Sequence, residues 1–353
     1  MGMLVDGKWH EYGYDIDKTD GEFIREQSKF RRFIVVRPHH ESVEDVLAHQ
    51  IDKNIPEKKN DDLAAKTEPD FIAEPGRYHL YVSYGCPWSH RALIYRELKD
   101  LQRMVSVSVL EPRMMEKGWE FQFIARNRPH CSGATADALF SKKYLYEIYQ
   151  RSQKTYTGRV TVPVLWDKRT NQIVNNESAD IIRMFNSVFN DFTKNHIDFY
   201  PSSLRKEIDS MNTWIYEKIN NGVYLCGFAS AQEAYDLAVT ELFEALDRID
   251  EILSTNRYLM GDQLTEPDWR LFVTLIRFDS VYFSLFKANR KRIEEYSHIS
   301  AYLRELYQLK HIANTVFFEH IKEHYYHNHP QVNPHRIIPA DYRIDYSSPH
   351  YRS

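Results

Sequence analysis

One stretch of the chain, residues 78–98, constrains its fold most, because a strand pattern gives way there to a helix pattern at a single cysteine. Residues 78–83 alternate and are rich in β-forming side chains, whereas residues 92–98 place apolar side chains on one helical face. Between them, Cys86 is followed by Pro87, which suits the first turn of a helix because its missing N–H costs nothing there. We therefore expect a sharp turn with Cys86 at a helix N-terminus.

That position has a chemical consequence for the thiol of Cys86. Unpaired backbone N–H groups and the positive end of the helix dipole stabilise a thiolate, so we expect an exposed thiol with a pKa below the ordinary value. A lone cysteine is most often buried and inert. The order strand, cysteine, proline and helix nevertheless favours a reactive nucleophile.

Composition narrows the classes of function. The 353 residues include only three cysteines, Cys86, Cys131 and Cys226, with no CxxC, which argues against a disulfide framework and for a reducing compartment. No signal-peptide core or membrane-spanning stretch is found, and a net charge of -4 with mixed signs argues against nucleic acid. We expect a cytoplasmic protein with no membrane partner. An aromatic content of 14% favours an aromatic or amphipathic small-molecule ligand.

The first half of the chain predicts an α/β domain. Residues 1–75 are interpreted as an N-terminal extension, with a charged loop over 37–70 that contains a short helix near 43–50. Residues 76–190 show a strand, a helix and a strand, and after a long insertion they show a β-hairpin and a helix. This is the thioredoxin-like order, βαβ followed by ββα. The hairpin strands are expected over 162–166 and 172–175.

The second half predicts an all-helical domain over 198–326 and a proline-rich tail over 327–353 that runs along the surface. Two sets of apolar residues are spaced for single helix faces: Leu204, Ile208, Met211, Ile215 and Ile219, and then Leu242, Leu246, Ile249 and Leu253. Two helix starts carry capping-box patterns, Ser230 with Glu233 and Thr265 with Asp268, the second with Pro267 in its first turn.

These features together resemble the glutathione transferase superfamily, and more specifically the glutathionyl-hydroquinone reductases, a branch near the omega class. The resemblance covers nearly the whole chain, including the opening residues 5–9 and the insertion around 116–119. The motifs that carry it are Cys86-Pro87-Trp88, Val162-Pro163, Asn176-Glu177-Ser178-Ala179-Asp180, Asn221-Gly222-Val223-Tyr224, and Arg277-Phe278-Asp279 leading to Tyr282.

The resemblance implies a glutathione site on the thioredoxin-like domain. Val162 would precede a cis-proline and leave its backbone N–H and C=O to pair with the cysteinyl unit of glutathione, although an edge-strand proline is the alternative. Glu177 and Ser178, which begin a helix, would hold the γ-glutamyl end, although a plain helix cap fits the same residues. Trp119, Arg159, Val160 and Thr161 are assigned to the glutathione site by the resemblance alone.

The resemblance also implies a reaction. The Cys86 thiolate would attack the sulfur of a glutathionyl-hydroquinone and form a mixed disulfide with glutathione, while Tyr224 protonates the departing aromatic carbon. Tyr282 and Tyr325 are assigned beside Tyr224, where phenols could stabilise the thiolate. A second glutathione would then release oxidised glutathione. No metal or bound redox cofactor would be required, and the family is expected to form homodimers.

Two other functions remain open at this point. An omega-like thiol transferase or dehydroascorbate reductase would use the same cysteine without a proton-donating phenol, and a glutathione-fold protein could bind without catalysis. A further pattern, Glu323, His324, His327 and His329, brings ligand-type residues together. Because no second cluster matches it, we expect a solvated helix end and no metal.

Overall fold

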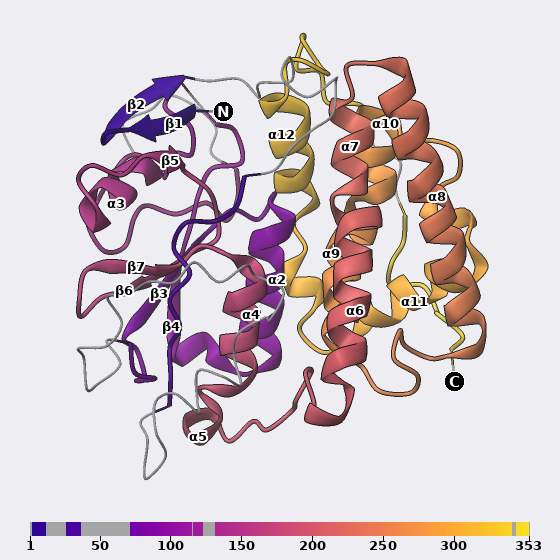
Figure 1. The fold of residues 1–353 in the computed structure, drawn as a ribbon, viewed down its shortest axis with the longest axis horizontal. Helices are drawn as coiled ribbons and strands as arrows, with labels where there is room; N and C mark the ends of the chain where they lie inside the picture. The colour runs from indigo at the N-terminus through magenta and orange to yellow at the C-terminus, as the bar shows by residue number, and fades with distance from the viewer. Residues whose placement is uncertain are drawn as a thin grey trace.

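The computed structural model describes residues 2–11, 26–36, 71–114, 116–122, 131–340 and 344–352. It forms a part built around a β-sheet and a helical part, which lie side by side (Figure 1). The loop expected over 37–70, with its short helix near 43–50, lies outside the described residues.

The central sheet has four strands, in the order β4-β3-β6-β7. β3 pairs in parallel with β4 and antiparallel with β6, which pairs antiparallel with β7. The strands span Val105–Val109 (β4), Tyr78–Val82 (β3), Val164–Asp167 (β6) and Gln172–Asn175 (β7). This topology confirms the thioredoxin-like α/β prediction.

Helices cover both faces of this sheet, so every residue of β3 and β6 is buried. α2 (Pro87–Leu98) and α4 (Ser178–Ser187) pack on the face that carries Leu80 and Leu165, while α3 (Leu145–Ser152) packs on the face that carries Tyr81 and Trp166. A strand points successive side chains to opposite faces, which explains why neighbouring residues belong to two separate hydrophobic clusters.

The N-terminal residues are bound to this part by a second, small sheet with the order β2-β1-β5. β1 (Gly2–Val5) and β2 (Lys8–Glu11) form a hairpin, and β1 also pairs with β5 (Gly158–Arg159). The indole N–H of Trp9 donates to the carbonyl oxygen of Glu116 at 3.2 Å. The hairpin therefore braces the loop that leads to Trp119.

Short elements join these strands and helices. They are a 3₁₀ turn after α2, η2 (Leu101–Arg103), the four-residue α5 (Asn190–Thr193), and three further 3₁₀ turns, η3 (Ser202–Leu204), η6 (Ile293–Glu295) and η7 (Ala313–Thr315).

The second half of the chain is helical, as expected from its apolar spacing. The helices are α6 (Arg205–Ile215), α7 (Gly222–Phe228), α8 (Gln232–Thr255), α9 (Glu266–Arg277), α10 (Phe283–Leu285), α11 (Ser297–Gln308) and α12 (Phe318–Asn328). Two π-helical turns, η4 (Tyr216–Asn220) and η5 (Phe278–Tyr282), continue α6 and α9. α12 ends at Asn328, so His327 belongs to this helix and the tail begins after it.

One of the two predicted capping boxes is present. Thr265 caps α9 and its backbone N–H donates to Asp268 at 2.8 Å, which confirms the prediction there. The prediction for Ser230 and Glu233 is wrong, because α8 begins at Gln232 with Ala231 as an extended N-cap residue that has no side-chain bond. Glu233 then occupies the second helical position, whereas a capping box needs an acid at the third.

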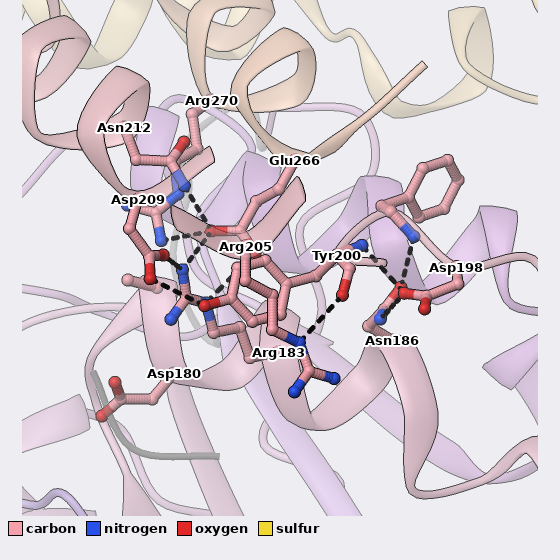
Figure 2. Close-up of polar contacts among 12 residues, drawn as sticks. Asp180, Arg183, Asn186, Asp198, Tyr200, Arg205, Asp209, Asn212, Glu266 and Arg270 are labelled. Carbon is pink, nitrogen blue, oxygen red and sulfur yellow. Dashed lines mark hydrogen bonds and ion pairs between the residues drawn. The ribbon is translucent and has the colours of Figure 1, made fainter. Parts of the chain in front are cut away.

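A buried polar cluster connects the two parts (Figure 2). Arg183 of α4 pairs with Asp209 of α6 and with Glu266 at the start of α9, and the last pair is 3.2 Å apart. Asn212 and Arg270 also contact Glu266. Burial opposes ionisation of Glu266, but Arg270 and Arg183 hold its pKa below the ordinary value. This ionic cluster fixes α4 against the helical part.

Among the described helices, none is both long enough and apolar enough to cross a membrane.

Candidate active site

Cys86 lies where the sequence predicts, at the N-cap of α2 with Pro87 as the first helical residue. Its backbone N–H donates to the carbonyl oxygen of Ser83 at 3.2 Å, and its own carbonyl accepts from His90 at 3.1 Å, which closes the first turn. The Sγ atom is 3.8 Å from the carbonyl oxygen of Val162. The thiol is therefore held against a second loop.

The expectation of an exposed thiol with a lowered pKa is wrong for this structure. Cys86 is only 6% exposed, and burial raises the pKa of its thiol above the ordinary value. The backbone N–H groups of Ser89 and Trp88, the charge of Arg277 and the hydroxyl of Ser89 act in the opposite direction. The start of α2 thus stabilises the thiolate, but loss of hydration outweighs this effect because burial disfavours the charged form.

The Val162-Pro163 peptide bond is cis, as the resemblance implies. β6 begins only at Val164, so Val162 lies outside the strand ladder and an edge-strand proline does not describe this position. The turn presents its carbonyl oxygen to Cys86. A backbone carbonyl that is not used by a strand ladder, beside a thiol, suits a peptide-like ligand.

Glu177 and Ser178 lie at the start of α4, as predicted. Glu177 caps the helix by accepting from the backbone N–H of Ala179 at 3.1 Å. Its other carboxylate oxygen accepts from the hydroxyl of Ser28 at 3.0 Å. The N-terminal segment thus reaches the same helix start, which the sequence did not indicate.

The remaining residues expected at a glutathione site divide into two groups. Arg159 and Thr161 line a small pocket of about 30 Å³ together with Glu26, Gln27, Ser28, Lys29, Tyr156 and Asn176. Val160 is buried next to them, and Arg159 forms an ion pair with Glu26 at 3.3 Å. Trp119, in contrast, stacks on the His324 ring of α12, with centroids 5.1 Å apart.

The three tyrosines expected opposite Cys86 form one hydrogen-bonded chain. The hydroxyl of Tyr325 is 2.6 Å from that of Tyr224 and 2.7 Å from that of Tyr282. Burial raises the pKa of both Tyr282 and Tyr325, which keeps these phenols protonated at neutral pH. The ring of Trp88, two residues after Cys86, lies 6.5 Å from that of Tyr224, so the chain of phenols lies close to the start of α2.

Aromatic rings that sequence analysis did not assign also lie beside these tyrosines. Trp88, two residues after the nucleophile, has its ring centroid 6.1 Å from that of Tyr216 and 6.5 Å from that of Tyr224, nearly parallel to the latter. Phe286 packs 5.5 Å from Tyr224. Flat apolar walls of this kind favour an aromatic substrate. Only the adjacency of Trp88 to Cys86 could have indicated this role.

The two π-helical turns explain how the helical part presents these groups. η4 carries Tyr216, and η5 ends at Tyr282. A π turn adds a residue to the helix and shifts the direction of the side chains that follow, and such turns are frequent at functional sites. Each turn adjoins one of the motifs that carry the resemblance, at Asn221 and at Arg277.

The other two cysteines are poor nucleophiles. Burial raises the pKa of Cys226 to about 12, and burial with the nearby carboxylate of Glu319 raises that of Cys131 to about 12. Unlike Cys86, neither stands at the start of a helix.

The acidic and histidine residues at the end of α12 are engaged separately, and the expectation of a solvated helix end is wrong because His324 and His329 are buried. Glu323 pairs with Arg113, His324 stacks on Trp119, and the ring of His329 packs against Phe228. Within the described part of the chain, no group of three or more ligand-type residues is arranged to hold a metal ion.

Comparison with known proteins decides the family. Residues 85–188 match the glutathione S-transferase N-terminal domain, and residues 232–305 match the glutathione S-transferase C-terminal domain. The chain is 45% identical to the glutathionyl-hydroquinone reductase YqjG of Escherichia coli over all of its length and 98% of that protein. It is 41% identical to the glutathionyl-hydroquinone reductase PcpF of Sphingobium chlorophenolicum, over 96% of each chain.

The chain belongs to the glutathionyl-hydroquinone reductase family. Its structure agrees with solved members of this family, which are also called Xi-class glutathione transferases. The glutathione-bound structure of YqjG superposes with a TM-score of 0.82 at 43% identity, covering 99% of both chains. The Xi-class enzyme of Natrialba magadii gives a TM-score of 0.82 at 42% identity, covering 99% of this chain and 96% of that one.

Proposed function

We propose that the protein reduces glutathionyl-hydroquinones to hydroquinones, with glutathione as the reductant and a mixed disulfide on Cys86 as the intermediate. The observation that carries this proposal is the meeting of a helix-start thiol with a hydrogen-bonded chain of three tyrosines, of which Tyr224 packs beside Trp88 in the first turn of α2. A thiol alone would serve disulfide exchange. The phenols supply what cleavage of a carbon–sulfur bond needs in addition, which is a proton donor.

Glutathione is expected to bind along the cis-proline turn. The backbone of Val162 would pair with its cysteinyl unit, which places the ligand sulfur beside Cys86. The γ-glutamyl end would lie at the start of α4, where Glu177 can pair with the ammonium group and Ser178 with the carboxylate. Trp119, Arg159, Val160 and Thr161 are proposed to complete this site. That YqjG has been solved with glutathione bound supports glutathione as the ligand.

In the first step, the Cys86 thiolate attacks the sulfur of the glutathionyl-hydroquinone. A sulfur–sulfur bond forms, the bond from sulfur to the aromatic carbon breaks, and its electron pair goes to that carbon, which takes a proton. Tyr224 is the proposed donor because it is the least buried of the three tyrosines, 8% exposed against 0% for the others. Tyr325, at 2.6 Å, can return a proton to Tyr224.

In the second step, the thiolate of a free glutathione attacks the glutathione sulfur of the mixed disulfide. Oxidised glutathione leaves and the Cys86 thiolate is restored. The sum is one glutathionyl-hydroquinone and one glutathione converted to one hydroquinone and one oxidised glutathione. One protein cysteine suffices because glutathione resolves the intermediate, and no step passes through a metal. We also propose that the protein works as a homodimer, which sedimentation analysis would test.

The test is an assay of the purified protein with glutathione and a glutathionyl-hydroquinone. We expect hydroquinone and oxidised glutathione in equal amounts. When free glutathione is withheld, mass spectrometry should find glutathione attached to the peptide that contains Cys86. Turnover without any such adduct, or an adduct on Cys131 or Cys226 alone, would contradict the proposal.

A further inference from the structure

Arg277 is a fully buried arginine whose charge the reaction described above does not use. It is the last residue of α9, where its Nη1 donates to the carbonyl oxygen of Val273 at 2.8 Å. Its Nε donates to the carbonyl oxygen of Gly85 at 3.2 Å, and its Nη2 donates to that of Tyr84 at 3.2 Å. The last two acceptors immediately precede Cys86. The helical part is therefore hydrogen-bonded to the turn that carries the nucleophile.

Among the residues that the structure describes, no acid neutralises the positive charge of Arg277. Within the described residues, no carboxylate forms an ion pair with its guanidinium, in contrast to Arg183, which is paired with Glu266 and Asp209. Three of its acceptors are neutral carbonyl groups and the fourth is the ring of His90. A buried charge without a counterion is costly and marks a candidate functional group.

His90 fixes the orientation of Arg277. Nη1 of Arg277 lies 2.9 Å from Nδ1 of His90, and because an arginine can only donate, Nδ1 must accept. The proton of the neutral ring is then on Nε2, which donates to the hydroxyl of Thr315 at 2.8 Å. Burial and the charge of Arg277 hold the pKa of His90 well below its usual range, so this arrangement persists at neutral pH.

The opposite side of the same turn is closed by α12. A Cβ added to Gly85 would lie 2.4 Å from the Cβ of His324 and 2.9 Å from the carbonyl oxygen of His320, so only glycine allows this approach. The ring of Tyr84 stacks on that of Phe317, with centroids 3.7 Å apart. The turn is thus held between the end of α9 and α12, and its position depends on both.

Four other titratable side chains near this turn are neutral at pH 7. Burial raises the pKa of Tyr282 on η5 and of Tyr325 on α12. Burial lowers the pKa of His324 on α12 to about 4, and His90 on α2 is neutral as described. Among the residues that the structure describes, Arg277 is therefore the charged side chain that acts on the thiol, and a positive charge favours the thiolate.

We propose that Arg277 is a positioning residue for Cys86: its guanidinium fixes the turn that carries the nucleophile, and its unneutralised charge favours the thiolate. The expected effect of Arg277 on turnover rests on the proposed function. Its expected effect on the pKa of the Cys86 thiol does not, because that effect is measured on the free protein.

The experiment measures alkylation of Cys86 by iodoacetamide as a function of pH, in a protein whose Cys131 and Cys226 are replaced by alanine, together with turnover. In Arg277→Gln we expect the alkylation rate at pH 7 to fall about tenfold and the pH profile of alkylation to move to higher pH. This corresponds to a pKa rise of about one unit, the smallest shift typical of losing a nearby opposite charge. In Arg277→Lys the charge remains, so the profile should stay close to that of the parent. Turnover should still fall, because an ammonium group cannot hold both carbonyl oxygens.

The matched control is Arg183→Gln, which removes another buried arginine and should lower stability while leaving the alkylation profile unchanged. An unchanged profile in a folded Arg277→Gln protein overturns the proposal. If Arg277→Gln does not fold, the test rests on Arg277→Lys. A tenfold loss of alkylation in that variant, although its charge is retained, would also overturn the proposal. A shifted profile in Arg277→Gln supports the inference even if the parent fails to reduce glutathionyl-hydroquinones, a result that would contradict only the proposed function.

Discussion

The Sγ atom of Cys86 lies 3.8 Å from the carbonyl oxygen of Val162, so the thiol of the free protein faces the backbone group proposed to bind glutathione. A neutral thiol can donate weakly to that oxygen, whereas a thiolate would be repelled by it. Bound glutathione would donate its own amide N–H to the same oxygen and remove this repulsion. The protonation state of Cys86 and the binding of glutathione are therefore expected to be coupled.

The first prediction concerns pH. Because burial raises the pKa of Cys86, the thiolate fraction at neutral pH is smaller than for an exposed cysteine, and it grows as the pH rises. Alkylation of the free protein should therefore have its midpoint above about 8.5, the value for an exposed cysteine. Iodoacetamide rates between pH 6 and 10, measured with Cys131 and Cys226 replaced by alanine, check this. A midpoint well below 8.5 would show that the helix N-terminus outweighs burial.

The second prediction concerns the identity of the nucleophile. Cys86→Ala should abolish turnover, because the mixed disulfide can no longer form. Cys131→Ala and Cys226→Ala should keep most activity, since a pKa of about 12 leaves each almost entirely protonated at neutral pH. Steady-state assays of the three variants, with circular dichroism to verify folding, provide the measurement. Loss of activity in either of the latter two, and not in Cys86→Ala, would overturn the assignment.

The third prediction separates reduction of glutathionyl-hydroquinones from simple thiol transfer. Breaking a carbon–sulfur bond leaves a carbon that must be protonated, whereas disulfide exchange expels a thiolate that needs no acid. Tyr224→Phe should therefore slow hydroquinone release by about 10²–10⁴-fold and affect exchange with a small glutathione mixed disulfide much less. Tyr325→Phe should show the same selectivity, because it breaks both hydrogen bonds of the tyrosine chain.

Equal losses in the two assays would argue instead that these tyrosines position glutathione or activate Cys86. If both variants kept full activity on both substrates, the tyrosines would have no part in the chemistry.

The fourth prediction concerns stability. Glu266→Ala leaves the buried Arg183 and Arg270 without their shared partner, and loss of one member of a buried ion pair typically costs about 3–5 kcal/mol. The pKa of Glu266 is lowered, so its contribution is present above the unfolded value of about 4.3 and is lost as the pH falls through the folded value. Urea unfolding should show a large difference from the parent at pH 7 that shrinks in acid.

The control for this experiment is Glu241→Ala, which removes a half-exposed ion pair with Lys218 and should cost at most about 1 kcal/mol. Similar losses for the two variants would mean that the buried cluster contributes no more than a surface pair.

Local patterns in the sequence determined the features that depend on neighbouring residues, such as helix starts, turns and the buried face of a helix. The turn at Cys86 follows from a strand pattern, a proline and a helix pattern that adjoin one another. The capping box of Thr265 and Asp268 and the buried face of α8 follow in the same way. At Ser230 the prediction failed because the chain stays extended through Ala231. The helix therefore begins one residue late, and Glu233 does not reach the third helical position that a capping box requires.

Tertiary structure alone decided the electrostatics of the site. A helix N-terminus predicts a stabilised thiolate. Whether the thiolate is hydrated, however, depends on loops and helices far away in sequence, and in this structure they bury it. The same holds for Arg277, which lies 191 residues after Cys86: the sequence places it in a motif that carries the family resemblance, but not against the turn that carries the nucleophile. Burial and long-range contacts are properties of the packed chain, because the dielectric environment of a group is set by whatever surrounds it in space.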